Sequence, residues 1–137
     1  MSLLFVSDLH LDAGRPATTQ AFLQLLGNEA RTAEAVYILG DLFEAWVGDD
    51  DPGEPGASVC AALMALSASG VPVFLMRGNR DFLYGQHMAE RCGATLLPDP
   101  CVVSLYGVPT LLMHGDLLCT DDTAYQAFRR QVRDPSW

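Results

Sequence analysis

Four runs of consecutive apolar residues divide this chain, and each run ends abruptly in a glycine or a polar residue. The runs cover residues 3–6, 36–39, 71–76 and 110–113. Apolar residues at consecutive rather than alternate positions indicate strands that are covered on both faces, as in the parallel sheets of α/β proteins. Residues 102–106, which precede Gly107, predict the first arm of a hairpin that leads into the last run.

The segments between the runs carry apolar residues at helical spacing, so the order of elements predicts an α/β fold. The predicted helices cover residues 18–33, 58–69, 82–92 and a segment that begins at 121. Thr18 or Thr19 is the expected N-cap of the first helix. Gly70 and Gly93 are the expected ends of the next two helices, and residues 50–56 are a predicted loop.

The composition excludes several classes of protein. The 137 residues fit one domain, and a chain that is 50% hydrophobic and 18% charged is not disordered. No apolar run approaches the roughly 18 residues of a membrane span. The first residues lack the basic and apolar regions of a signal peptide, which predicts a cytoplasmic protein. The net charge of −9 disfavours nucleic acid as a partner.

Polar side chains that can bind a metal follow all four predicted strands. In open α/β sheets the carboxyl ends of the strands form the edge where ligands bind, so we expect these side chains to converge. Asp41 follows Gly40 directly after an apolar run, and a buried carboxylate requires a basic side chain, helix N–H groups or a metal as its partner. The five candidate ligands are Asp8, His10, Asp41, Asn79 and His114.

The donor set combines oxygen with imidazole nitrogen and contains no thiolate. This combination argues against a structural zinc cage, and it suits Mn, Fe, Co, Zn or similar divalent ions. Two such ions about 3.5–4 Å apart that share a carboxylate can generate a hydroxide and clamp a phosphoryl group.

Four blocks in sequence order resemble those of the calcineurin-like metallophosphoesterases. They are DLH at 8–10, GDLFEAWVGDDD at 40–51, GNRDF at 78–82 and MHGD at 113–116. Within this family, FEAWVGDDD, GNRDFL and HGDLLCTDDTAYQAFR are similar to the branch that hydrolyses UDP-2,3-diacylglucosamine in lipid A synthesis. The resemblance covers nearly all of residues 1–137 and implies a layered α/β sandwich.

The resemblance also implies roles for the candidate ligands. Asp8 and His10 would hold one ion, Asp41 would bridge the pair, and Asn79 and His114 would hold the other ion, usually Mn²⁺. The implied reaction splits the pyrophosphate bond of UDP-2,3-diacylglucosamine into UMP and 2,3-diacylglucosamine 1-phosphate.

Three residues would contact the substrate according to the same resemblance: Asn79, Arg80 and Asp122. Asp122 has a second interpretation, because it also lies where it can cap the following helix. Arg80 stands where many metallophosphoesterases have a histidine that assists the leaving group. A guanidinium cannot donate a proton near neutral pH. Arg80 therefore favours a phosphoanhydride, whose phosphate leaving group has a second pKa of about 6, over an alkyl phosphodiester.

Apolar residues beside these blocks are candidate walls of an acyl pocket, although for any one of them ordinary core packing is the favoured role. Trp46 is the preferred candidate because it lies in an otherwise acidic loop. The other candidates are Leu42, Phe43, Val47, Phe82, Leu83, Tyr125 and Phe128.

A Gly-His-x-His block that completes both metal spheres in the family does not occur among these residues. We therefore expect the chain to be the N-terminal portion of a longer protein that continues into further strands and a helical cap. We expect residues 1–137 alone to retain metal poorly and to turn over little substrate. The full-length protein is expected to contact the cytoplasmic face of the inner membrane peripherally.

Two alternatives remain open at this point. The chain could be a metallophosphoesterase that acts on a nucleotide, a phosphoprotein or a nucleic acid, although Arg80 and the acidic charge disfavour this. It could also be a non-catalytic α/β module whose acidic residues serve only the structure.

Overall fold

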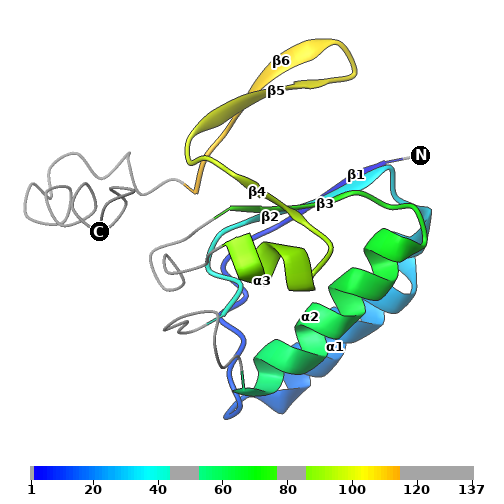
Figure 1. Cartoon of the computed structure of the whole chain (residues 1–137), viewed down its shortest axis with the longest axis vertical. Coiled ribbons are helices and arrows are strands. Elements are labelled where there is room, and N and C mark those ends of the chain that lie inside the picture. Colours follow the sequence, from blue (N-terminus) through cyan, green and yellow to red (C-terminus); the bar gives the residue numbers. More distant parts are fainter. Residues whose placement is uncertain (1, 44–52, 77–85, 115–137) are drawn as a thin grey trace, which may run out of the picture.

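The computed structural model describes residues 2–43, 53–76 and 86–114, and it contains a parallel four-stranded sheet (Figure 1). The strands stand in the order β1-β2-β3-β4. Three of them match the first three apolar runs, although β3 begins two residues later than predicted, and β4 was not predicted. The strands are β1 (Leu3–Val6), β2 (Ala35–Leu39), β3 (Val73–Met76) and β4 (Thr95–Leu97).

Helices cover one face of this sheet. Each strand pairs with the next one along the chain, always on the same side in the sheet. Because crossover connections between parallel strands are right-handed, all the helices then lie on the same face. Figure 1 shows α1, α2 and α3 together below the strands. Within the described residues, no helix is both long and apolar enough to cross a bilayer. The helices are α1 (Pro16–Gly27), the short 3₁₀ helix η1 (Glu29–Thr32), α2 (Gly53–Ala68) and α3 (Gln86–Arg91).

A hairpin lies against the opposite face. Its strands are β5 (Cys101–Leu105) and β6 (Val108–Leu112), which pair in antiparallel register. Leu112 of the hairpin packs in one apolar cluster with Tyr37 and Met76 of the sheet. Two buried layers therefore sandwich β2 and β3, which confirms for these two strands the prediction of coverage on both faces. The same prediction is wrong for β1, where Phe5 is 44% exposed, and for β6, where Leu111 is 57% exposed.

The two faces follow from the alternation of side chains along each strand. Val36 and Ile38 of β2 point into the helical core, while Tyr37 joins the hairpin cluster. On the hairpin face, the ring of Tyr37 stacks between Phe5 and Phe74, with ring centroids 5.0 and 4.7 Å apart. These three residues are register partners on adjacent strands, so the stack ties β1, β2 and β3 together.

The first helix differs from its prediction at both ends. It begins at Pro16, with Arg15 rather than Thr18 or Thr19 at the N-cap, and Thr19 is buried. The fixed φ of a proline and its missing N–H suit the first helical position, which explains the earlier start. The predicted helix also breaks after Gly27 into the separate 3₁₀ turn η1.

Other boundaries are closer to the prediction. Residues 53–56, predicted as part of a loop, form the first turn of α2. Gly70 and Gly93 follow α2 and α3 with φ of +106° and +62°, as expected for glycines that end helices. The last predicted helix and residues 82–85 of the third lie outside the described residues.

Candidate metal centre

Two loops leave the carboxyl ends of β1 and β2 side by side, and they carry three of the predicted ligands. The N–H of Asp8 donates to the carbonyl of Gly40 at 3.1 Å, and the N–H of His10 donates to the carbonyl of Asp41 at 3.0 Å. A further bond of 2.9 Å joins the N–H of Leu11 to the carbonyl of Leu42. The parallel pairing of the strands therefore continues past their ends and holds the two loops in register.

Three of the predicted ligands have backbone φ angles in the left-handed region. Asp8, His10 and Asp41 have φ of 56°, 49° and 53°. For a residue other than glycine this conformation costs about 1–2 kcal/mol, so the bonds between the loops must hold it in place. Such residues concentrate at functional sites, and here all three are candidate metal ligands.

Gly40 explains how the carboxylate of Asp41 can follow directly after the apolar strand β2. Its φ of 99° lies in a region that residues with a Cβ avoid, and it turns the chain immediately after β2. The turn leaves Asp41 buried, with only 2% of its surface exposed.

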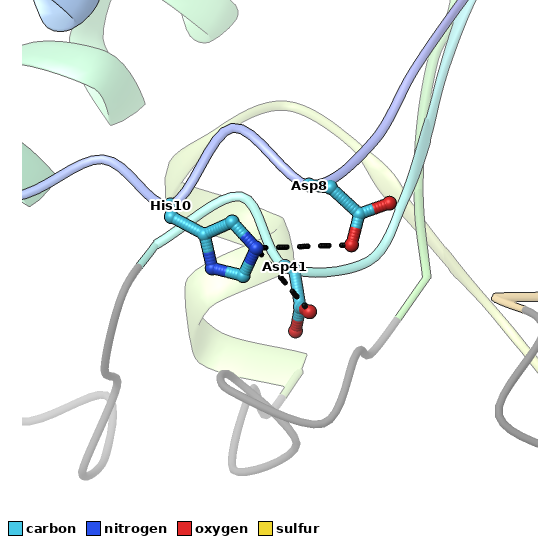
Figure 2. Close-up of side chains that lie close together, drawn as sticks. All are labelled: Asp8, His10 and Asp41. Carbon is cyan, nitrogen blue, oxygen red and sulfur yellow. Dashed lines mark ion pairs between the residues drawn. The ribbon is translucent and has the colours of Figure 1, made fainter.

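The side chains of these residues point toward one another (Figure 2). Nε2 of His10 lies 3.8 Å from Oδ1 of Asp8 and 3.8 Å from Oδ2 of Asp41. One donor atom from each of the three residues falls within 4.8 Å of the other two. The side chain of Asp8 is 55% exposed and that of Asp41 is 3% exposed, so the cluster opens to solvent on the Asp8 side.

His114 reaches the same carboxylate from the second sheet. It follows β6, and its Nε2 lies 3.4 Å from Oδ2 of Asp41. Its other ring nitrogen, Nδ1, lies 2.9 Å from the carbonyl oxygen of Leu39. A single oxygen of Asp41 therefore lies close to both His10 and His114, which is the position that a bridging ligand requires.

The pKa of His114 is raised from 6.5 to about 9. The main cause is the hydrogen bond with Asp41, and the bond to the Leu39 carbonyl and the charges of Asp41 and Asp8 act in the same direction. Burial opposes the shift because it disfavours the charged imidazolium. In the metal-free protein, protonated His114 therefore neutralises the buried charge of Asp41 at neutral pH.

Asp99 and Leu39 support His114 and were not predicted. Oδ1 of Asp99 accepts a hydrogen bond of 3.2 Å from the backbone N–H of His114. In β5 and β6, Cys101 pairs with Leu112, and the same register continued by two residues places Asp99 opposite His114. The predicted hairpin thus contained a signal for Asp99. The Leu39 carbonyl had none, because backbone groups leave no mark in a sequence.

Most of the other predicted site residues lie outside the described part of the chain, and their roles stay predictions. Leu42 and Phe43 are described, and both are buried in the helical core, with 0% and 3% exposure. They are core residues and are not available as walls of an acyl pocket. The residues outside the described ranges are Asn79, Arg80, Asp122, Trp46, Val47, Phe82, Leu83, Tyr125 and Phe128.

A cavity of about 310 Å³ lies between the first turns of α1 and α2. It is lined by Asp12, Thr19, Ser58 and neighbouring residues, and by none of the donors of the cluster. It is therefore separate from the candidate metal centre.

The donor set fits divalent metal ions. Carboxylate and imidazole donors without thiolate suit Mn, Fe, Co or Zn in open, reactive sites. The shared position of Asp41 between two imidazoles matches a centre that holds a pair of ions.

Comparison with known proteins identifies similar sequences over the whole chain. The sequence model of the calcineurin-like phosphoesterase family matches residues 1–136. A UDP-2,3-diacylglucosamine hydrolase of Xanthomonas campestris pv. campestris (strain B100) is 61% identical over 137 residues, which are 100% of this chain and 56% of that protein.

Two further relatives carry the same name. The protein of Xanthomonas oryzae pv. oryzae (strain PXO99A) is 62% identical over 135 residues, 98% of this chain and 55% of its own length. The protein of Stenotrophomonas maltophilia (strain R551-3) is 59% identical over 137 residues, 100% of this chain and 55% of its own length. The chain thus spans about half the length of the curated relatives it matches.

Proposed function

The chain belongs to the calcineurin-like phosphoesterase family, and on this premise we propose that the protein hydrolyses the pyrophosphate bond of UDP-2,3-diacylglucosamine. The products would be UMP and 2,3-diacylglucosamine 1-phosphate, which places the reaction in lipid A synthesis. The proposal is supported by identities of 59–62% to proteins named for hydrolysis of this substrate. The structural observation that carries it is the meeting of Asp8, His10 and His114 around the carboxylate of Asp41.

The proposed metal ligands divide into two groups around Asp41. Asp8 and His10 would hold one divalent ion, and His114 with Asn79 would hold the second, with Asp41 shared between them. The ions, which we propose to be Mn²⁺, would supply an activated water and positive charge at the phosphoryl oxygens. The exposed side of Asp8 offers the route by which a bulky anionic substrate can reach this centre.

A backbone carbonyl of the protein orients the imidazole of His114. The Leu39 carbonyl accepts at Nδ1 of His114 and leaves Nε2 directed at Asp41. A ligand histidine held in this way by a carbonyl keeps one tautomer and one ring orientation. Nε2 of His114 must release its proton before it can bind a metal, because its raised pKa keeps it protonated in the metal-free protein.

Arg80 and Asn79 are proposed to act on the substrate itself. Arg80 would offset charge that grows on the phosphoryl oxygens, and a phosphate leaving group needs no proton from it. Asp122 is proposed as a further substrate contact. Trp46, Phe82, Tyr125 and Phe128 are proposed to line the acyl chains. Cytoplasmic location with peripheral contact to the inner membrane would bring the enzyme to such a lipid substrate.

The test uses the full-length protein, demetallated and then supplied with Mn²⁺, with UMP release as the measurement. Asp41→Asn should lower UMP release by at least about 100-fold, because it removes the shared ligand. Glu29→Gln, a change at an exposed acid of η1, is the matched control and should leave the rate unchanged. Faster hydrolysis of bis(p-nitrophenyl) phosphate than of UDP-2,3-diacylglucosamine would instead assign the protein to another phosphodiester.

A further inference from the structure

Arg15 contacts the backbone of a proposed metal ligand. Its Nη2 donates a hydrogen bond of 3.1 Å to the carbonyl oxygen of His10. We propose that Arg15 is a positioning residue, which holds the left-handed backbone of His10 so that its imidazole faces Asp8 and Asp41. The inference rests on the proposed role of His10 in metal binding, and it assigns to Arg15 a role that the family's sequence blocks do not include.

The backbone of His10 is held from both sides. Its N–H donates to the carbonyl of Asp41 at 3.0 Å, and its carbonyl accepts from Arg15. With φ at 49°, His10 has a conformation that the chain leaves readily unless both of its peptide groups are fixed. Loss of the Arg15 bond would remove this restraint on the second peptide group and so loosen the direction of the side chain.

A tight turn brings Arg15 back over His10. The N–H of Arg15 donates to the carbonyl of Asp12 at 3.0 Å, which closes the turn over residues 12–15. Pro16 follows and restricts the backbone of Arg15. The turn and Pro16 therefore restrict where the guanidinium can lie. Less conformational entropy is then lost when it binds the carbonyl of His10.

Helix stability does not explain an arginine at this position. Arg15 is the N-cap of α1, where Ser, Thr, Asp or Asn is preferred, and within the described residues no side chain caps this end. A cation beside the positive end of a helix dipole is unfavourable as well. Locally unfavourable residues are expected where function requires them, and the bond to His10 is such a requirement.

The charge of Arg15 and its hydrogen bond act in opposite directions on metal affinity. The guanidinium repels a cation in the nearby centre, while the bond preserves the ligand geometry. Arg15 is exposed, so solvent and salt weaken the repulsion more than they weaken the contact. We therefore expect loss of the arginine to weaken metal binding.

The experiment measures Mn²⁺ affinity by calorimetry in the demetallated full-length protein. Arg15→Asn should raise Tm by about 2–4 °C, because asparagine is a good N-cap. The same substitution should weaken Mn²⁺ binding by about 3–10-fold. Arg15→Lys, which keeps a donor, should restore most of the affinity. Arg31→Asn, at an exposed arginine of η1, should leave the affinity unchanged.

Opposite changes in Tm and affinity exclude partial unfolding as the cause. Unchanged or tighter Mn²⁺ binding by Arg15→Asn would overturn the proposal. A raised KM for substrate with unchanged Mn²⁺ affinity would also overturn it, and would make Arg15 a substrate contact. Because the readout is metal affinity, the result stands even if UDP-2,3-diacylglucosamine proves not to be the substrate.

Discussion

Nε2 of His114 lies 3.4 Å from Oδ2 of Asp41, and both side chains are almost fully buried, with 7% and 3% exposure. A buried carboxylate needs a compensating charge, and in the metal-free protein the imidazolium of His114 provides it. The pair also joins the two sheets, since Asp41 follows β2 and His114 follows β6. The electrostatics of the site and the packing of the hairpin are therefore coupled.

The stability of the metal-free protein should depend on pH through His114. Its pKa is about 9 when folded and 6.5 when unfolded, so its contribution is fully present below pH 6.5 and is lost as the pH rises through 9. A shift of this size corresponds to at most about 3 kcal/mol. Urea denaturation between pH 6 and 10 should show the loss. The loss should disappear in His114→Gln, and an equal pH slope in that variant would contradict the assignment.

Substitutions of Asp41 and Asp8 should differ in how many ions they affect. Asp41→Asn should weaken the binding of both ions, because its carboxylate lies beside both histidines. Asp8→Asn should weaken one ion and leave the other near its original affinity, since Asp8 lies beside His10. Calorimetric titration with Mn²⁺ provides both affinities. Equal effects of the two substitutions would argue against a bridging Asp41.

Gly40→Ala should destabilise the protein by about 1–2 kcal/mol or more, because a Cβ is strained at a φ of 99°. The control is Gly27→Ala at the end of α1, where a Cβ would meet nothing within 4 Å. That substitution should stabilise the protein by up to about 1 kcal/mol, because it restricts the unfolded chain. Denaturant midpoints measure both, and a shift of the same sign in the two variants would contradict the argument.

Asp99 should matter as an acceptor rather than as a charge. Asp99→Ala removes the partner of the His114 N–H and should weaken Mn²⁺ binding by about 3–10-fold. Asp99→Asn keeps a carbonyl oxygen in reach and should restore most of that affinity. If the two variants bind Mn²⁺ equally weakly, the carboxylate acts through its charge and the positioning role is wrong.

Part of the site could be predicted because it depends on local rules. Continuous apolar runs predicted the buried strands β2 and β3, and adjacent parallel strands bring Asp8, His10 and Asp41 to one edge of the sheet. His114 does lie beside Asp41, but the reason expected from the sequence for its position was incomplete. His114 arrives from the antiparallel hairpin and not from the parallel sheet, so the rule for open α/β sheets does not place it.

The sequence by itself determined the fold class, the faces of β2 and β3, and which residue types could bind a metal, because burial periodicity and donor chemistry are properties of the chain. Only the tertiary structure decided which groups form hydrogen bonds with the candidate ligands: Asp99 and the Leu39 carbonyl with His114, and Arg15 with His10. Those contacts depend on hairpin register and on the direction of individual peptide groups. Neither is encoded in the pattern of apolar and polar residues.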